Sequence, residues 1–186
     1  MFLQKKRPSY AGSHASGQLY LSGVERYLPA GSTIVSKTDV HGLITYANDT
    51  FIDISAYAER ELLGAPHSIL RHPAMPRCVF KLLWDTVEQG QEIFAYVINR
   101  CKNGDHYWVL AHITPCYDAH NTIIGYHSNR RPARPEALAV IQPLYKELLD
   151  IEGRSERKEG MEVSTQALLK VLKSKKVSYA EFVFSL

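Results

Sequence analysis

The alternation of apolar and polar residues changes its period along the chain, and these changes mark the expected elements. Residues 1–31 carry scattered glycine, serine and proline without a sustained period, so we expect an N-terminal extension there. From Thr33 the pattern favours a β-hairpin, with strands over Ile34–Thr38 and Leu43–Tyr46 and a turn at Asp39–Gly42. A regular domain therefore begins with this hairpin.

Two short helical patterns follow the hairpin. Asn48 offers an N-capping side chain to a helix that includes Phe51 and Tyr57. A second short helix is expected over Glu59–Leu63, and Gly64 is a natural C-terminal cap for it. Both helices are too short to form a core alone, so we expect them to lie against the strands.

A connector over residues 64–76 holds two His, one Arg and three Pro. Such a rigid polar segment is costly inside a small domain, so we expect it to shape a pocket. After it, apolar residues recur at helical spacing from Phe80 through Trp84 to Val87, and Gly90 stops the run. This spacing predicts one long central helix.

Three strand patterns complete the domain, over Ile93–Arg100, His106–Tyr117 and Thr122–Arg130. Lys102–Asp105 and Asp118–Asn121 supply the hairpin turns between them. The order of elements predicts an α+β fold, with a five-stranded antiparallel sheet and helices on one face. A pocket is expected between the sheet and the helices.

The remaining chain predicts a helix over Glu136–Leu149, a charged, glycine-containing linker over Glu152–Glu162 and an amphipathic segment over Val163–Lys176. The amphipathic segment is either a docking helix for a partner or a disordered tail. The predicted division is an N-terminal extension at 1–31, the sheet domain at 32–132, a C-terminal flanking helix at 133–150, and a linker with an amphipathic tail at 151–186.

Length and composition fit one soluble domain with end segments: 186 residues, 45% hydrophobic and 22% charged. The net charge of +3 comes without a basic stripe interleaved with aromatics, so nucleic acid is not an expected partner. No apolar run approaches the roughly 20 residues that span a bilayer, and no apolar run follows the basic N-terminus. We therefore expect a cytoplasmic protein without direct membrane insertion.

Candidate chemistry is sparse. Cys78, Cys101 and Cys116 are odd in number and form no CxxC pair, which argues against a disulfide framework and a structural metal site. The sequence contains no G-x-S-x-G, P-loop, H-E-x-x-H or dinucleotide-binding glycine motif. A catalytic function is therefore not expected.

Several separated motifs together match one known pattern. They are Ala47-Asn48-Asp49-Thr50-Phe51, Arg71-His72-Pro73 in the connector, Leu83-Trp84, Asn99-Arg100, the run from Lys102 to Val109, and Gly125-Tyr126. In this order they resemble the PAS sensor domain of bacterial aerotaxis receptors, over roughly residues 32–150. The resemblance implies a PAS fold and a sensor of redox or oxygen state that holds FAD non-covalently.

The resemblance also assigns cofactor contacts and partners. By position in the motifs, it implies that Arg71, His72, Phe94 and Asn99 help to hold the FAD. Ala74 stands where the family has Asp, and Phe94 replaces a Trp. A methyl-accepting chemotaxis-type receptor or another signal transducer is the implied partner, with a homodimer formed through the sheet or the N-terminal extension.

The strand after the last turn adds two candidates. His127 and Asn129 alternate onto one face, which in relatives carries Met and Ile and so is expected to face the core. We expect one of them, Asn129 by preference, to hydrogen-bond the flavin; the alternative is a bulge that turns both to solvent. The full candidate cofactor set is Asn48, Arg71, His72, Trp84, Phe94, Asn99, His127 and Asn129.

Two other functions remain open at this point. The first is a gas sensor in which the PAS domain binds haem b, with His67 or His72 as the axial ligand. The second is a cofactor-free PAS module that only binds a protein partner. The colour of the purified protein separates the three hypotheses.

Overall fold

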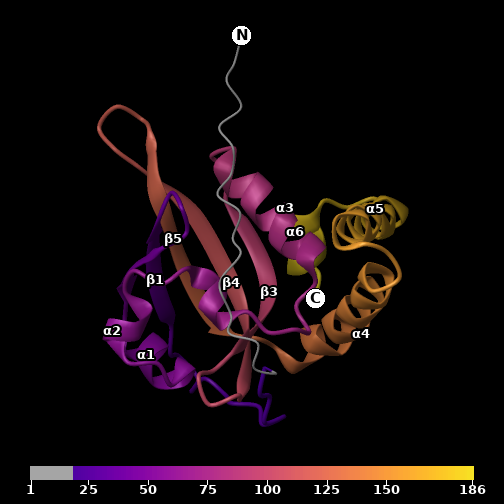
Figure 1. Ribbon diagram of the computed structural model, residues 1–186. Helices are drawn as coiled ribbons and strands as arrows, with labels where there is room; N and C mark the ends of the chain where they lie inside the picture. The colour runs from indigo at the N-terminus through magenta and orange to yellow at the C-terminus, as the bar shows by residue number, and fades with distance from the viewer. Residues whose placement is uncertain (1–18) are drawn as a thin grey trace.

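One antiparallel sheet organises the chain, seen in a computed structural model that describes residues 19–186 (Figure 1). Its five strands lie in the order β2-β1-β5-β4-β3, so the first hairpin pairs with the last strand. The strands are β1 (Ile34–Asp39), β2 (Ile44–Ala47), β3 (Ile93–Arg100), β4 (His106–Tyr117) and β5 (Ile123–Pro132). The predicted five-stranded antiparallel sheet is confirmed.

Helices fill the segments before and after the last three strands. Those between β2 and β3 are α1 (Asp49–Ser55), α2 (Glu59–Leu62), the 3₁₀ helix η1 (His67–Leu70) and α3 (Arg77–Glu88). Those after β5 are α4 (Pro135–Glu152), α5 (Arg157–Lys175) and α6 (Tyr179–Phe184). In Figure 1, α1 and α2 lie at the β1 side of the sheet, and α3 crosses in front of β3 and β4.

Register divides the sheet side chains into two faces. Ser36 pairs with Ser128, Ala111 with Arg130, and Asn99 with Tyr107, so all of these share one face. Phe51 and His67 of the preceding helices contact Arg130 on this side. We call this face, which α1, η1 and α3 cover, the inner face, and the opposite one the outer face.

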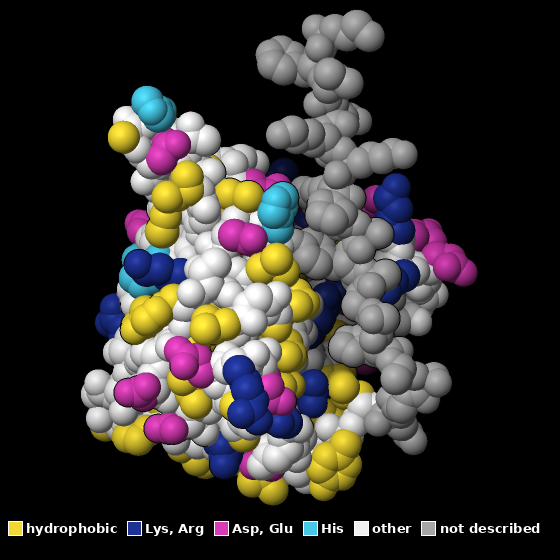
Figure 2. All heavy atoms as spheres, turned by 60° about the vertical axis from the view of Figure 1, so that its left-hand side comes forward, with side chains coloured by type: hydrophobic (Ala, Val, Ile, Leu, Met, Phe, Trp, Pro, Cys, Tyr) yellow, Lys and Arg dark blue, Asp and Glu magenta, His cyan; other side chains and the backbone are white. Residues whose placement is uncertain are grey.

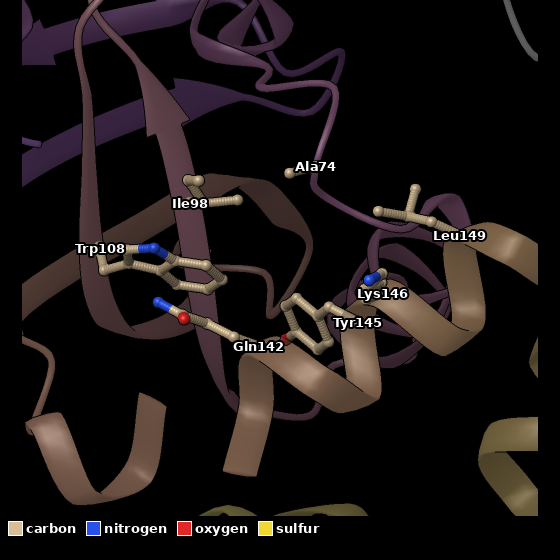
Figure 3. A pocket seen from close by; sticks show the side chains of 7 residues that line it. All are labelled: Ala74, Ile98, Trp108, Gln142, Tyr145, Lys146 and Leu149. Carbon is tan, nitrogen blue, oxygen red and sulfur yellow. The ribbon is translucent and has the colours of Figure 1, made fainter. Parts of the chain in front are cut away.

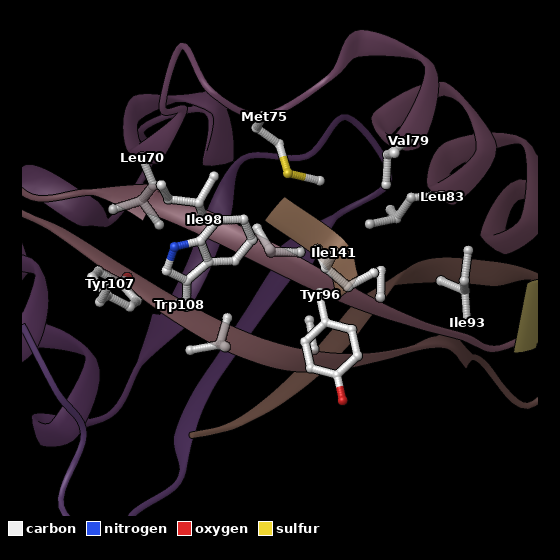
Figure 4. Packing of buried hydrophobic residues seen from close by; sticks show 14 of the residues in the cluster. Leu70, Met75, Val79, Leu83, Ile93, Tyr96, Ile98, Tyr107, Trp108 and Ile141 are labelled. Atoms are coloured by element: carbon white, nitrogen blue, oxygen red, sulfur yellow. The ribbon is translucent and has the colours of Figure 1, made fainter. Parts of the chain in front are cut away.

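The apolar core lies over β3 and β4. Figure 4 shows Leu70 and Met75 of the connector and Val79 and Leu83 of α3 packed above these strands. All four are buried. Of the residues in the predicted helical run, Leu83 and Val87 are buried on the side of α3 that faces the sheet. The core therefore fixes the connector and α3 against the domain.

The connector also meets both end strands of the sheet. Ile44 of β2 accepts a hydrogen bond from the backbone N–H of Gly64 (2.8 Å) and donates one to the carbonyl of Ala65 (2.9 Å). A few residues later, Arg71 forms an antiparallel bridge with Asn99 of β3. Gly64 has φ of +78°, the left-handed conformation that glycine adopts readily at the end of a helix, as predicted.

The segment predicted as a charged linker is mostly helical, and the prediction over Glu152–Glu162 is wrong. Glu152 is the last residue of α4, and α5 begins at Arg157. The reason is burial: Glu152 is 4% exposed and accepts hydrogen bonds from the backbone of Arg77 (3.1 Å) and Cys78 (2.9 Å). It therefore caps α3, whose N-cap residue is a proline.

Helix α5 packs closely against the end of α4. Ser164 Oγ donates to Glu152 Oε1 (3.0 Å), and Arg77 Nε donates to Glu152 Oε2 (2.9 Å). A Cβ at Gly160 would lie 2.4 Å from the carbonyl oxygen of Glu152, so only glycine permits this approach. The helix predicted over Glu136–Leu149 is confirmed as part of α4.

The C-terminal helices reach the outer face, in addition to the helices on the inner face. Tyr145 of α4 donates from its hydroxyl to the carbonyl of Tyr96 (2.6 Å), and Phe184 of α6 lies 4.6 Å from Phe94 between ring centroids.

None of the helices within residues 19–186 combines the length and the apolar character that a membrane span needs.

The surface seen in Figure 2 is chemically mixed. Over the described part of this face, Lys and Arg side chains alternate with Asp, Glu and exposed apolar side chains. The described part of this face therefore carries no continuous patch of one charge sign.

Candidate functional site

A buried guanidinium lies on the inner face. Arg130 of β5 is 2% exposed; its Nε donates to Ser128 Oγ (3.1 Å), and its Nη2 donates to Ser36 Oγ of β1. The guanidinium carbon lies 5.0 Å from the ring centroid of Phe51 in α1, within the range of a cation–π interaction. The strand β5 and helix α1 therefore hold Arg130 between them.

His67 of the connector completes this cluster. Its Nε2 lies 2.7 Å from Arg130 Nη2, and its ring is stacked over Phe51 with 6.4 Å between centroids. Burial, together with the nearby charge of Arg130, lowers the pKa of His67 to about 3. The imidazole is therefore neutral at pH 7, and its Nε2 accepts the hydrogen bond from Arg130.

Arg130 has no acidic partner. No carboxylate within residues 19–186 forms an ion pair with it, and residues 1–18 contain neither Asp nor Glu. Burial lowers the pKa of Arg130, but a guanidinium stays protonated in proteins. Within residues 19–186, the inner face therefore carries a positive charge whose hydrogen-bond partners are all neutral.

Further polar atoms on the same face are buried without a partner. Among the described residues, Thr38 Oγ1, Asn99 Nδ2, Tyr107 Oη and Arg130 Nη1 accept and donate no hydrogen bond of normal geometry, although the Asn99 amide lies near the Tyr107 hydroxyl. They come from four strands: β1, β3, β4 and β5. Thr38 lies apart from the others, because it pairs with Tyr126, and Tyr126 pairs with Pro115, eight residues along β4 from Tyr107. Buried polar atoms in folded proteins are nearly always paired, so the atoms of Asn99, Tyr107 and Arg130 mark a place for a polar ligand.

Arg71 does not point its charge at this cluster. Its guanidinium carbon lies 4.9 Å from the ring centroid of Phe80 in α3. Burial lowers the pKa of Arg71, as does the charge of Arg157, whereas Glu152 raises it. The side chain therefore faces the C-terminal helices, and only its backbone bridge to Asn99 connects it to the inner face.

His72 lies beside the same strand edge. Its ring is 5.4 Å from that of His106, and its Nδ1 accepts a hydrogen bond from the backbone N–H of Ala74 (3.1 Å). Burial, and then the charges of His106 and Arg100, lower the pKa of His72 to about 4. His72 is therefore neutral at pH 7.

Two other candidates lie next to the inner face. Trp84 of α3 packs edge-on against Tyr126 of β5, with 5.4 Å between ring centroids, where it can form a wall of the site. Asn48 caps α1: its Oδ1 accepts from the backbone N–H of Phe51 and Val35, and its Nδ2 donates to the carbonyl of Thr33. Both polar atoms of the Asn48 amide are thus used within the chain.

His127 and Asn129 lie on the outer face, and the expectation that they face the core is wrong. The pairing of β1 with β5 runs without a register shift from Gly125 to Arg130, so no bulge is present in this stretch either. Strict alternation then turns Tyr126, Ser128 and Arg130 inward and the residues between them outward.

Phe94 also lies on the outer face. It pairs with His112 of β4, and their rings stack with 4.0 Å between centroids. Phe184 of α6 also contacts Phe94, with the two rings tilted against each other. Of the eight candidates, Asn99 alone places an unpartnered polar atom in the inner-face cluster.

Sequence reasoning missed Arg130 and Tyr107. The available signal was alternation: once Tyr126 is assigned to the inner face, Ser128 and Arg130 must follow it. An arginine at the end of a strand is usually read as exposed, because Arg is rarely buried unless paired.

Two cavities lie away from this cluster. One of about 310 Å³ lies between the connector, the outer-face residue Trp108 and helix α4, where Tyr145 and Lys146 line it (Figure 3). The other, of about 340 Å³, lies between residues 26–32 and α1. Neither of these two cavities lies on the inner face, where His67 and Phe51 pack over Arg130. A flavin that contacted Arg130 would therefore have to displace the connector or α1.

Comparison with known proteins agrees with the fold. Residues 44–130 match the family described as PAS fold, and together with the sheet and its covering helices this shows that the chain contains a PAS domain. Over 133 residues the chain is 42% identical to the aerotaxis receptor of Escherichia coli strain K12, covering 72% of this chain and 26% of the receptor. The domain belongs to the aerotaxis-receptor type of PAS domain.

More distant relatives share shorter stretches. The nitrogen fixation regulatory protein of Klebsiella pneumoniae is 30% identical over 100 residues, which cover 54% of this chain and 20% of that protein. The light-state structure of the blue-light photoreceptor Aureochrome1 LOV matches with a TM-score of 0.52 and 20% identity, over 63% of this chain and 91% of that one. This structural likeness shows the fold alone.

Proposed function

We propose that this chain is a cytoplasmic PAS sensor of redox or oxygen state that binds FAD non-covalently between the inner face and helices α1 to α3. The oxidation state of the flavin would alter its contacts with the inner face, and the change would pass to a chemotaxis-type receptor or another signal transducer. The role requires no catalysis by the chain. The sensor unit would be residues 32–132.

The unpartnered atoms on the inner face carry this proposal. Asn99 Nδ2 and Arg130 Nη1 are donors, and Tyr107 Oη can donate or accept. A flavin ring offers carbonyl and ring-nitrogen acceptors along one edge, so its hydrogen-bonding pattern fits these residues. The similarity to the aerotaxis receptor supports the choice of a sensor over other PAS functions.

Ligand entry supplies a route for signalling. Because His67 and Phe51 pack over Arg130, a bound flavin must displace part of the connector or of α1. The connector leads directly into α3, whose first residues are held by Glu152 at the end of α4. A shift of the connector would therefore act on the C-terminal helices, which we propose as the output element.

The absorption spectrum of the purified protein, with the released cofactor identified, tests the proposal. We expect the bands of oxidised flavin and released FAD. Asn99→Val should weaken FAD binding about tenfold, the effect of one hydrogen bond to a buried polar group. Asn129→Val is the matched control on the outer face and should bind FAD as the wild type does; equal binding by both variants would place the flavin elsewhere.

The same spectrum tests the two alternatives. A Soret band would support haem b with His72 as ligand; His67 is less suited, because its Nε2 already accepts from Arg130. A colourless protein that gains no flavin on reconstitution would support the cofactor-free PAS module. The proposed homodimer, through the sheet or the N-terminal extension, is tested by light scattering of the purified chain.

A further inference from the structure

The charge of Arg130 is unusual because it is buried among neutral groups. Its hydrogen-bond partners are the hydroxyls of Ser36 and Ser128 and the neutral imidazole of His67. Burying an ion costs several kcal/mol unless an opposite charge compensates it. The hydroxyls and the imidazole satisfy some of its N–H groups, but they leave the net charge in place.

The neighbouring unpartnered atoms have the same polarity. Asn99 Nδ2 and Arg130 Nη1 can only donate hydrogen bonds, and the Tyr107 hydroxyl, toward which the Asn99 amide is directed, can donate one. Burial raises the pKa of Tyr107, so this hydroxyl stays protonated and supplies no negative charge. The inner face therefore presents a positive charge and several donors, which is complementary to a group that is rich in acceptors and negatively charged.

We propose that the inner face binds a negatively charged form of its ligand more tightly than the neutral form, and that Arg130 is the residue that makes this selection. This rests on the proposed function in one respect, namely that the ligand is FAD. The neutral form is then the oxidised ring, and the charged form is the ring after it has gained two electrons and one proton. A second proton would make the reduced ring neutral, but it stays in solution. The ring therefore keeps one negative charge, along the edge that carries its acceptors.

Four proteins test the selection: wild type, Arg130→Met, Arg130→Lys and Arg131→Met. Arg131 is the next residue of β5, exposed and on the outer face, so it is the matched control. For each protein, the dissociation constant is measured for oxidised FAD and, without oxygen, for FAD reduced with dithionite. The dissociation constant of oxidised FAD divided by that of reduced FAD reports the preference for the reduced form.

We expect this ratio to fall about tenfold or more in Arg130→Met, which corresponds to the loss of one hydrogen bond to a charged group. Arg130→Lys keeps the charge and should retain most of the preference, and Arg131→Met should match the wild type. A ratio in Arg130→Met equal to that of the wild type would overturn the proposal while leaving FAD binding intact. Should Arg130→Met not fold, Arg130→Gln is measured in its place with the same expectation.

If the wild type binds no FAD in either state, the proposed function fails. The role of Arg130 is then tested by comparing the urea unfolding of the ligand-free wild type and Arg130→Met. A cation that awaits a negative ligand destabilises the ligand-free chain, so ligand-free Arg130→Met should unfold at the same or a higher urea concentration than the wild type. Unfolding of Arg130→Met at a lower urea concentration would show that Arg130 stabilises the domain without a ligand, and the inference would be wrong.

Discussion

Arg130 and Glu152 are both buried charges, and their surroundings are opposite. Glu152 is 4% exposed and accepts hydrogen bonds from two backbone N–H groups, the Arg77 guanidinium and the Ser164 hydroxyl. These donors hold the pKa of the Glu152 carboxyl below its usual range despite burial. Arg130 has hydroxyl and imidazole partners, one unpartnered nitrogen and no counter-charge among the described residues.

The difference separates a structural charge from one suited to a ligand. Every partner of Glu152 lies within the chain, on α3 and α5, so the carboxylate closes a contact between helices. The partners of Arg130 leave its charge uncompensated, which is a common property of binding sites. Three experiments can break or sharpen this contrast.

The largest effect is expected at Glu152. Glu152→Ala leaves the N-terminus of α3 and the Ser164 hydroxyl without an acceptor, and should lower the free energy of unfolding by about 3 kcal/mol. Chemical denaturation monitored by circular dichroism measures the loss. Glu147→Ala, at an exposed position of α4, should have almost no effect; a similar loss in both variants would remove the special role of Glu152.

Lowering the pH should reduce the free energy of unfolding through His67, the hydrogen-bond partner of Arg130. The pKa of His67 is about 3 in the folded chain against an ordinary value of 6.5, so between these values the unfolded chain holds a proton that the folded chain lacks. The contribution of His67 to the free energy of unfolding is therefore fully present above pH 6.5 and is lost as the pH falls towards 3. His72, with a pKa of about 4, acts in the same direction.

His67→Gln keeps an acceptor for Arg130 but cannot titrate. Between pH 6 and pH 4 its stability should fall less steeply than that of the wild type, by about 1.4 kcal/mol per pH unit for one proton. Urea unfolding at a series of pH values gives the two slopes. His120→Gln, at an exposed turn position, should keep the wild-type slope, and an unchanged slope in His67→Gln would mean that His67 can be protonated in place.

The smallest effect is expected at Gly160. Gly160→Ala places a Cβ 2.4 Å from the carbonyl of Glu152 and must push α5 away, whereas alanine favours the helix itself. The net loss should be about 1 kcal/mol in thermal or chemical unfolding. At Gly153 the nearest atom would be 3.5 Å away, an ordinary contact, so Gly153→Ala is the control. A stabilised Gly160→Ala would show that α4 and α5 are not in close contact.

The strands and turns could be predicted because their signals are local. Alternation gave the five strands, and Gly42 and Gly64 marked ends where the backbone has positive φ. The face of β5 could not be read from its own residues, since Phe51 and His67, far away in sequence, cover Arg130. Glu152 was likewise hidden, because its donors at Arg77 and Cys78 lie more than seventy positions earlier.

The candidate site shows the same division between local signals, which the sequence carries, and long-range contacts, which it does not. The resemblance selected the connector and Asn99 as cofactor contacts, which stay a prediction; the structure adds that Asn99 is buried and has an unpartnered amide nitrogen. The resemblance gave no information on which way Arg71 would face, because that depends on Phe80 and on the position of α5. Long-range packing, rather than motif identity, decides which polar atoms remain available.

The connector has a further consequence for how copies of this domain can assemble. It is hydrogen-bonded to β2 at Ile44 and bridged to β3 at Asn99, and these two strands are the ends of the sheet. An extended peptide or a second sheet that paired at these points would have to displace the connector first. The connector therefore hinders the addition of a further strand at both edges of the sheet. Outward movement of the connector would expose the edges of β2 and β3 together.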